Sequence, residues 1–157
     1  MAFGQLSIKG RALRLLSQRE HSRSELARKL ARHAQDTDEL SAQEVVAQTL
    51  DELTASGFLS DERAARSVLS LKAGRFGLLK IRQTLLEKGL APDLIASTLD
   101  QARSIEAETA REVWLRKFGR QALDAKERGR QHRFLAGRGF SAAVIHGLLN
   151  SPASIDE

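Results

Sequence analysis

The sequence predicts an all-α protein: three tandem three-helix (helix-turn-helix-like) repeats that form an elongated, curved array. Three observations predict this class. The 157-residue chain is rich in leucine, alanine, arginine, glutamate and glutamine and has only two prolines, a composition that favours helices. No segment shows the strict apolar–polar alternation of a half-buried strand. The chain also resembles itself at a fixed spacing, which is typical of helical repeat proteins.

The internal repeat is clearest between residues 80–100 and 130–150, which share four identities. These identities are a core leucine, the glycine after the first helix and two core positions of the second helix. A third copy lies upstream and needs an insertion around residues 35–40 to stay aligned. It matches Leu26, Leu30, Val46 and Leu50 to Ile81, Leu85, Ile95 and Leu99. The predicted repeats cover residues 7–59, 60–103 and 104–150, and residues 151–157 are a disordered tail.

In the first repeat we expect helices near 8–19, 23–33 and 42–56. Ser22 and Ser41 are each followed by glutamate three residues later, the capping-box pattern of a helix start. The predicted apolar stripe recurs at intervals of three and four and comprises Leu13, Leu16, Leu26, Leu30, Val46, Leu50 and Leu53.

In the second repeat we expect helices near 61–73, 78–88 and 92–103. Ser60 precedes two acidic residues and is expected to cap the first of these helices. Pro92 suits the first turn of the third helix, where its missing amide hydrogen costs nothing. The predicted apolar stripe comprises Val68, Leu71, Ile81, Leu85, Ile95 and Leu99.

In the third repeat we expect helices near 105–118, 122–137 and 142–150, the last capped by Ser141. Trp114 and Phe118 lie one helical turn apart and are expected in the core or at a seam between repeats. The remaining stripe residues are Val113, Phe134, Leu135, Ile145, Leu148 and Leu149. Across the chain, five glycines follow helical segments, where a left-handed residue is favoured: Gly57, Gly74, Gly89, Gly119 and Gly139.

Several functional classes are not expected. The chain has no cysteine, which excludes disulfides and thiolate metal sites and fits a cytoplasmic protein. Its four histidines lack metal-ligand spacing and are expected to be capping or surface residues. Residues 74–77 do not form a phosphate loop, and residues 36–39 are not a calcium loop. We therefore expect no enzymatic activity, metal or cofactor. No secretory signal and no membrane-spanning run is predicted, and we expect a monomer.

The charge of +5 is unevenly distributed. Basic stretches at residues 1–35, 63–90 and 113–140 alternate with acidic stretches at 36–62 and 91–112. A single basic stretch is typical of a solvated helix face. Three of them in step with a structural repeat indicate one basic stripe, the electrostatic footprint for a polyanion or an acidic protein surface.

The middle helix of each predicted repeat carries most of these charges at positions that avoid the apolar stripe. The candidate binding residues are Arg28, Lys29, Arg32, Lys72, Arg75, Lys80, Arg82, Lys88, Arg130, Arg133 and Arg138. Only Gln83 and Thr84 could read base edges on these helices, so non-specific phosphate contact is the more credible form of DNA binding.

Four segments form an ordered set along the chain: RALRLLSQREHSRSELARKL at 11–30, GFLSDER at 57–63, KIRQTL at 80–85 with Lys88-Gly89, and FLAGRGF at 134–140. Together they resemble the RecX family, which regulates the RecA recombinase. The resemblance covers about residues 9–150. It implies a curved array of three-helix units that binds the RecA–DNA filament along its groove. It also implies suppression of ATP turnover, strand exchange and the filament's role in repressor self-cleavage, and hence modulation of recombination, DNA repair and the SOS response.

The chain departs from the family pattern at two positions. Ala64 stands where an aromatic residue is frequent, and Leu78 stands where a proline is frequent. The second change is expected to loosen the start of the helix that carries Lys80 and Arg82. The alternatives to RecA regulation are a general DNA-binding protein acting on single-stranded or double-stranded DNA, and a scaffold acting through apolar seams.

Overall fold

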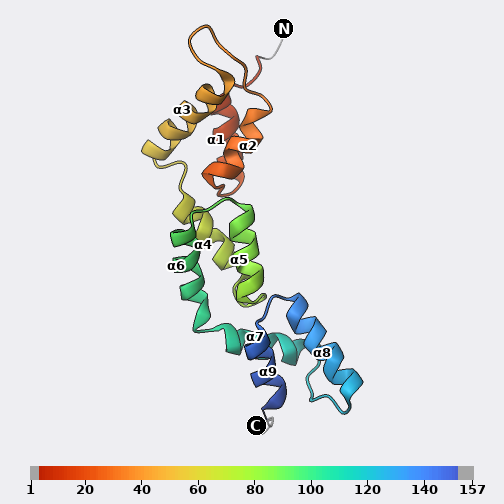
Figure 1. The fold of residues 1–157 in the computed structure, drawn as a ribbon. Coiled ribbons are helices and arrows are strands. Elements are labelled where there is room, and N and C mark those ends of the chain that lie inside the picture. Colours follow the sequence, from red (N-terminus) through yellow and green to blue (C-terminus); the bar gives the residue numbers. More distant parts are fainter. Residues whose placement is uncertain (1–3, 152–157) are drawn as a thin grey trace. The chain divides into compact units, whose positions relative to one another are not determined.

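The computed structural model describes residues 4–151, which form nine α-helices and no strand, so the predicted all-α class is confirmed (Figure 1). The helices are α1 (Ile8–Gln18), α2 (Arg23–Ala31), α3 (Ala42–Ala55), α4 (Asp61–Lys72), α5 (Leu78–Glu87), α6 (Pro92–Arg103), α7 (Glu106–Lys117), α8 (Ala125–Gly137) and α9 (Ala142–Asn150). Residues 152–157 of the predicted tail lie outside the described residues.

Most predicted helix starts agree closely with the structure, and local side-chain caps set several of them. Ser22 and Ser41 form complete capping boxes, and Ser60 and Ser141 accept from backbone amides three residues ahead. The predicted start of the eighth helix, at residue 122, is wrong. Asp124 is extended there (φ −146°, ψ 174°) and its carboxylate accepts the amide of Glu127 at 2.8 Å. A side-chain cap at Asp124 therefore delays the helix to Ala125.

The chain forms two compact units. Unit 1 comprises residues 1–67 and 87–91, and unit 2 comprises residues 68–86 and 92–157, so α4 and α5 each contribute to both. The division into three repeats remains a prediction, since the second predicted repeat is shared between these units.

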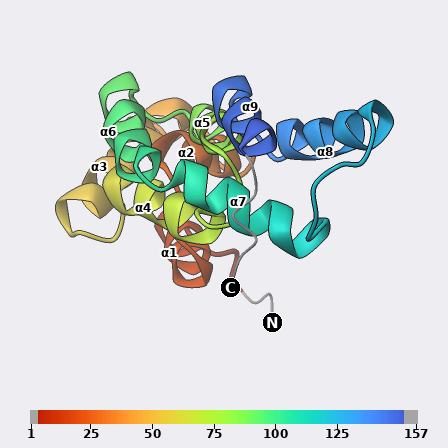
Figure 2. The ribbon, with the colours of Figure 1, turned by 90° about the horizontal axis from the view of Figure 1, so that it is seen from below.

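In unit 1, α1, α2 and α3 pack on one another around a small aliphatic core (Figure 1). Its buried members are Ala12, Leu26, Leu30, Val46, Leu50, Leu53 and Leu59. In unit 2, α7, α8 and α9 enclose Ala110, Val113, Trp114, Leu135, Phe140 and Ile145. Figure 2 shows the loop after α7 leading outward to α8, which returns toward α9.

Trp114 is buried as expected, and its Nε1 donates to Oε1 of Gln131 at 2.9 Å. Leu71, predicted to be a core residue, is instead 68% exposed. On α4 the buried side chains are those of Ala64, Ala65 and Val68. At about 100° per residue, Leu71 lies about 70° from the centre of that stripe, beyond its edge, and it is exposed to solvent.

Equivalent positions of the repeat make equivalent contacts within each unit. In unit 1, the hydroxyls of Ser22 and Ser24 donate to the carbonyls of Lys88 and Gly89. In unit 2, the amides at the positions aligned with these serines, Gly77 and Leu79, donate to the carbonyls of Arg138 and Gly139. We call each of these contacts a repeat joint: the start of one middle helix rests on the turn that follows another.

Each joint requires glycine for two reasons. Gly89 and Gly139 have φ of +67° and +88°, the left-handed region that L side chains rarely adopt. A Cβ at Gly89 would lie 2.7 Å from Ser24, and one at Gly139 would lie 2.5 Å from Cβ of Lys80. The five glycines predicted to end helical segments all have positive φ.

A buried carboxylate stabilises the joint of unit 2. Glu106 is 7% exposed, and its Oε1 accepts the amides of Leu78, at 3.3 Å, and Ser141, at 3.4 Å. The negative charge thus lies at the starts of α5 and α9, where the helix dipole favours it. Leu78 supplies an N–H that a proline would lack. This hydrogen bond fixes the start of α5, whereas the sequence led us to expect a looser helix start at Leu78.

In unit 1 the corresponding charged centre is Glu25. Its carboxylate pairs with Arg19 at 2.6 Å and with Lys88 at 3.0 Å, and it accepts the amide of Ser22 at 3.2 Å. Burial opposes ionisation, but these three donors outweigh it and lower the pKa of Glu25 to about 2. Beside it, His21 is buried rather than at the surface, and it is bonded to the Arg19 carbonyl and to Lys29.

Glu25→Gln is expected to lower the free energy of unfolding by about 2 kcal/mol at neutral pH, because it removes two partly buried ion pairs. The ordinary pKa of Glu25 is 4.5 and its folded pKa is about 2. Its contribution is therefore complete above pH 4.5 and is lost as the pH falls toward 2. Thermal unfolding followed by circular dichroism between pH 7 and pH 2.5 measures it. The difference between the two proteins should shrink below pH 4.5, and a constant difference would contradict the assignment.

Candidate functional site

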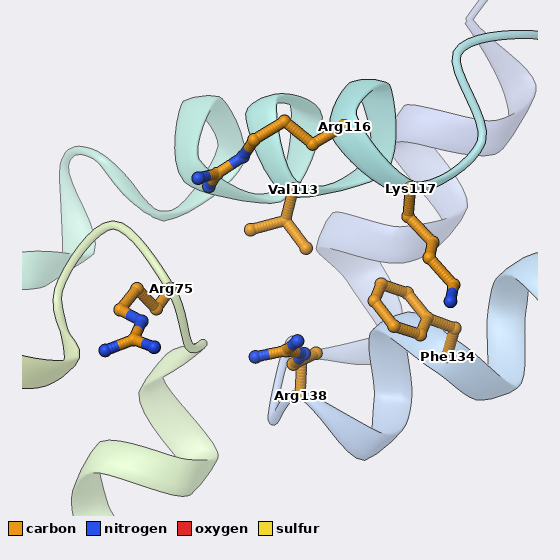
Figure 3. A pocket seen from close by; sticks show the side chains of 6 residues that line it. All are labelled: Arg75, Val113, Arg116, Lys117, Phe134 and Arg138. Atoms are coloured by element: carbon orange, nitrogen blue, oxygen red, sulfur yellow. The ribbon is translucent and has the colours of Figure 1, made fainter.

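In unit 2, a cleft of about 330 Å³, here called the basic cleft, is lined by four bases that make no ion pair with the described residues. Its lining residues are Arg75, Val113, Arg116, Lys117, Phe134 and Arg138. They come from the loop between α4 and α5, from the end of α7, and from the end of α8 with the turn after it. Figure 3 shows the three arginine side chains around one open space, with Val113 between them and Lys117 beside Phe134.

Two aromatic rings hold the cations in this region. The Phe76 ring has Lys72 Nζ at 4.8 Å, Lys80 Nζ at 5.7 Å and the Arg138 guanidinium carbon at 5.2 Å. The Phe134 ring has Arg138 at 5.4 Å and Lys117 at 5.4 Å. Such contacts fix long side chains without neutralising them. The rings therefore pre-order cations that remain available to an anion.

The repeat joint of unit 2 brings these groups together. The bond from the Gly77 amide to the Arg138 carbonyl, 2.9 Å long, links the loop that carries Arg75 and Phe76 to the turn that carries Arg138. Arg116 reaches the same loop and donates to the Gly74 carbonyl at 3.3 Å. Segments far apart in sequence thus bring their positive charges together at the basic cleft.

No carboxylate of residues 4–151 forms an ion pair with the bases of the basic cleft and its rim. These six bases are Lys72, Arg75, Lys80, Arg116, Lys117 and Arg138. By contrast, Arg103 and Arg120 elsewhere in unit 2 pair with Asp100 and Glu127. Like charges held together without counter-charges raise the local potential and favour an anionic partner.

The predicted basic residues divide into distinct groups. Lys72, Arg75, Lys80 and Arg138 come together at the basic cleft and its rim. The remaining candidates in unit 2 are exposed and do not line the cleft: Arg82, Arg130 and Arg133.

In unit 1, two candidates contribute to the repeat joint. Lys88 pairs with Glu25, and Arg28 donates to the Glu87 carbonyl at 3.0 Å. Lys29 and Arg32 line a different groove, in the same unit.

Five residues of the basic cleft and its rim are not among the predicted binding residues: Phe76, Val113, Arg116, Lys117 and Phe134. Arg116 and Lys117 stand in the last turn of α7, outside the middle helices on which the prediction placed the binding residues. Phe76 lies in the glycine-flanked loop set aside as a false phosphate loop, and Phe134 was assigned to the core. A signal existed, since aromatic residues close to clustered bases are typical of nucleic-acid-binding surfaces.

The described part of the chain contains no group of three or more histidine, cysteine, aspartate or glutamate residues that could hold a metal ion. Within the same residues, no helix is both long enough and apolar enough to cross a membrane.

Comparison with known proteins identifies relatives along most of the chain. Residues 60–99 match the family model described as the second three-helix domain of RecX, and residues 104–149 match that of the third. The "Regulatory protein RecX" of Leptothrix cholodnii is 52% identical over 145 residues, covering 92% of this chain and 88% of the relative. That of Herminiimonas arsenicoxydans is 44% identical over 151 residues and covers 96% of each chain.

A solved structure supports the fold. The crystal structure of RecX from Lactobacillus salivarius matches with a TM-score of 0.72, covering 90% of this chain and 92% of that one at 18% identity. The helical-repeat fold predicted from the sequence is therefore confirmed.

Proposed function

The chain belongs to the RecX family of regulatory proteins, and from this membership we propose that it binds the RecA–DNA filament and inhibits it. Inhibition would extend to the filament's ATPase, strand exchange and coprotease activities. The protein would thereby modulate recombination and the SOS response, acting without catalysis of its own, as a monomer in the cytoplasm. The relatives from Leptothrix cholodnii and Herminiimonas arsenicoxydans are both named regulatory proteins.

One observation carries the proposal at the level of residues: the basic cleft concentrates cations that no carboxylate of the described chain neutralises. A nucleoprotein filament presents phosphate and acidic protein surface side by side. Cations already ordered by Phe76 and Phe134 lose little conformational freedom on binding such a surface. A protein held on neighbouring protomers in this way would hinder the rearrangements that ATP turnover requires.

The second candidate function is general DNA binding through phosphate contacts. The aromatic rings at the basic cleft favour it, because bases of single-stranded DNA stack on such rings. This function predicts binding to DNA alone that weakens steeply with added salt.

The deciding experiment titrates the protein, at sub-stoichiometric amounts, into RecA hydrolysing ATP on single-stranded DNA. We expect the ATPase rate to fall well before the protein equals RecA in concentration, since one bound molecule would affect several protomers. The control measures binding to the same DNA without RecA by fluorescence anisotropy at physiological salt. ATPase inhibition only at concentrations that saturate bare DNA would favour the second function and would contradict filament regulation.

A further inference from the structure

A second groove, in unit 1, has a chemistry different from that of the basic cleft. It has a volume of about 330 Å³ and lies against α1 and α2. Three leucines and five basic or histidine side chains line it: Leu6, Leu15, Leu30, Arg11, Arg14, Lys29, Arg32 and His33. We call it the leucine groove.

The apolar part of the leucine groove is aliphatic throughout. Leu30 is 1% exposed and belongs to the core of unit 1, whereas Leu6 is 46% exposed. Covering Leu6 with another apolar side chain would remove that surface from water, which is favourable. Among the described residues, no phenylalanine, tyrosine or tryptophan ring lines the groove, so His33 offers the one imidazole on which a base could stack.

Among the described residues, the four groove bases have no ion-pair partner, whereas most other bases of unit 1 have one; Arg28 and Arg66 are the exceptions. Within the described residues, five bases of unit 1 pair with carboxylates at 3.6 Å or less: Lys9, Arg19, Arg23, Arg63 and Lys88. None of the four groove bases does: Arg11, Arg14, Lys29 and Arg32. Unneutralised charge in unit 1 is therefore concentrated where the surface is also hollow and apolar.

Lys29 is held in place by a buried neighbour. Its Nζ donates to Nε2 of His21 at 3.1 Å, and Nδ1 of that histidine bonds the Arg19 carbonyl at 3.0 Å. His21 is 1% exposed, so its ring cannot move aside without disturbing the core. The ammonium group is thus fixed beside the groove, which lowers the entropy cost of pairing it with a carboxylate.

We propose that the leucine groove binds a short acidic segment of a partner protein, in which carboxylates flank one aliphatic or aromatic anchor residue. The anchor would cover Leu6 and Leu15, and the carboxylates would pair with Arg14, Lys29 and Arg32. The volume lies at the lower end of the range of about 300–1,000 Å³ typical of ligand sites, which suits one or two side chains. This proposal depends on unit 1 alone and does not require the proposed RecA function.

A nucleic-acid strand fits the groove less well than such a peptide. Its phosphates would pair with the arginines and Lys29, but it has only sugar carbons and thymine methyl groups to place over the leucines. Among the described lining residues, only the imidazole of His33 could stack on a nucleobase. A flat anionic membrane surface could reach the exposed bases but could not fill the hollow between them. The combination of apolar floor and basic rim therefore favours a peptide.

The test titrates the full chain into an acetylated, fluorescein-labelled peptide, Glu-Glu-Leu-Phe-Glu-Glu, and follows anisotropy without any recombinase present. A second peptide replaces Leu-Phe by Ser-Ser, and an oligothymidylate serves as a polyanion competitor. We expect the Leu-Phe peptide to bind about tenfold more tightly than the Ser-Ser peptide, a difference of about 1.4 kcal/mol gained by covering the apolar anchor. Equal affinity for the two peptides, or displacement by the oligothymidylate at lower concentration than by unlabelled peptide, would overturn the proposal.

Matched variants locate the binding. Arg32→Glu is expected to weaken the Leu-Phe peptide about fivefold, while Arg66→Glu, an equal charge change at another exposed and unpaired base of unit 1, leaves it unchanged. Leu6→Ser is expected to weaken it about threefold, and Phe58→Ser, at a side chain 57% exposed outside the groove, is its control. Peptide-induced amide shifts at Leu6, Leu15 and Arg32 in the unaltered protein provide a readout independent of variants. Shifts confined to other residues, or equal effects of each variant and its control, would refute the site.

Discussion

Gly139→Ala is expected to lower the free energy of unfolding by about 3 kcal/mol or more, because two penalties fall on one residue. Its φ of +88° is unfavourable for any L side chain, and the added Cβ would lie 2.6 Å from the backbone nitrogen of Lys80. Relief requires the turn after α8 to move away from the start of α5. That movement would break the bonds from Gly77 and Leu79 that form the joint.

Two other glycines of unit 2 separate these penalties. Gly74 has φ of +81° but open space around its Cβ position, so Gly74→Ala should cost only about 1 kcal/mol. Gly137 is helical and equally open, so Gly137→Ala should be neutral or stabilise by up to about 1 kcal/mol. Urea unfolding monitored by Trp114, the single tryptophan, reports all three. If Gly139→Ala lowers the free energy of unfolding no more than Gly74→Ala does, the repeat joint accommodates the added Cβ without an energetic penalty, and the prediction is wrong.

The double substitution Arg75→Glu with Arg116→Glu is expected to weaken inhibition of the RecA filament by about tenfold or more. Both side chains line the basic cleft and are exposed, so their reversal replaces attraction by repulsion without opening a core. The measurement is the protein concentration that halves RecA ATPase activity on single-stranded DNA. Far-UV circular dichroism should show unchanged helical content.

The matched control is Arg111→Glu with Lys126→Glu, which makes the same change in net charge at exposed positions of unit 2 that do not line the cleft. A third variant reverses the bases predicted from sequence, Lys80, Arg82 and Arg133, of which only Lys80 adjoins the cleft region. If the control weakens inhibition as much as the cleft variant, total charge rather than the cleft governs binding. If the cleft variant inhibits as well as the unaltered protein, the assignment of the cleft is wrong.

Helices were predictable from this sequence because their ends are set locally. Ser22 with Glu25 and Ser41 with Glu44 satisfy their own backbone amides, and no distant residue is needed to complete the cap. The late start of α8 follows the same rule. Asp124 and Glu127 have capping-box spacing, and this local signal predicts a helix start at Ala125 rather than at residue 122.

The basic cleft was only partly predictable because it depends on contacts between distant segments. Lys72, Arg75, Lys80 and Arg138 could be proposed from the charge pattern, but nothing local places residue 75 near residues 116 and 138. That proximity follows from the close approach of Gly77 and Gly139, where a Cβ on Gly77 would overlap the Gly139 carbonyl. Likewise the residues next to Lys88 in the sequence do not distinguish it from a base that is free to bind a partner. Only the folded structure shows that Lys88 pairs with Glu25.

The repeat joints have a consequence for how such a chain can evolve. In both units the acceptors are main-chain carbonyls, at residues 88 and 89 and at residues 138 and 139. Every residue has a main-chain carbonyl, so a duplicated segment keeps these acceptors when its codons later change, provided that the glycine is retained. The side chains of the accepting turn are then free to diverge, which accounts for modules that share four residues in twenty-one and still accept equivalent hydrogen bonds.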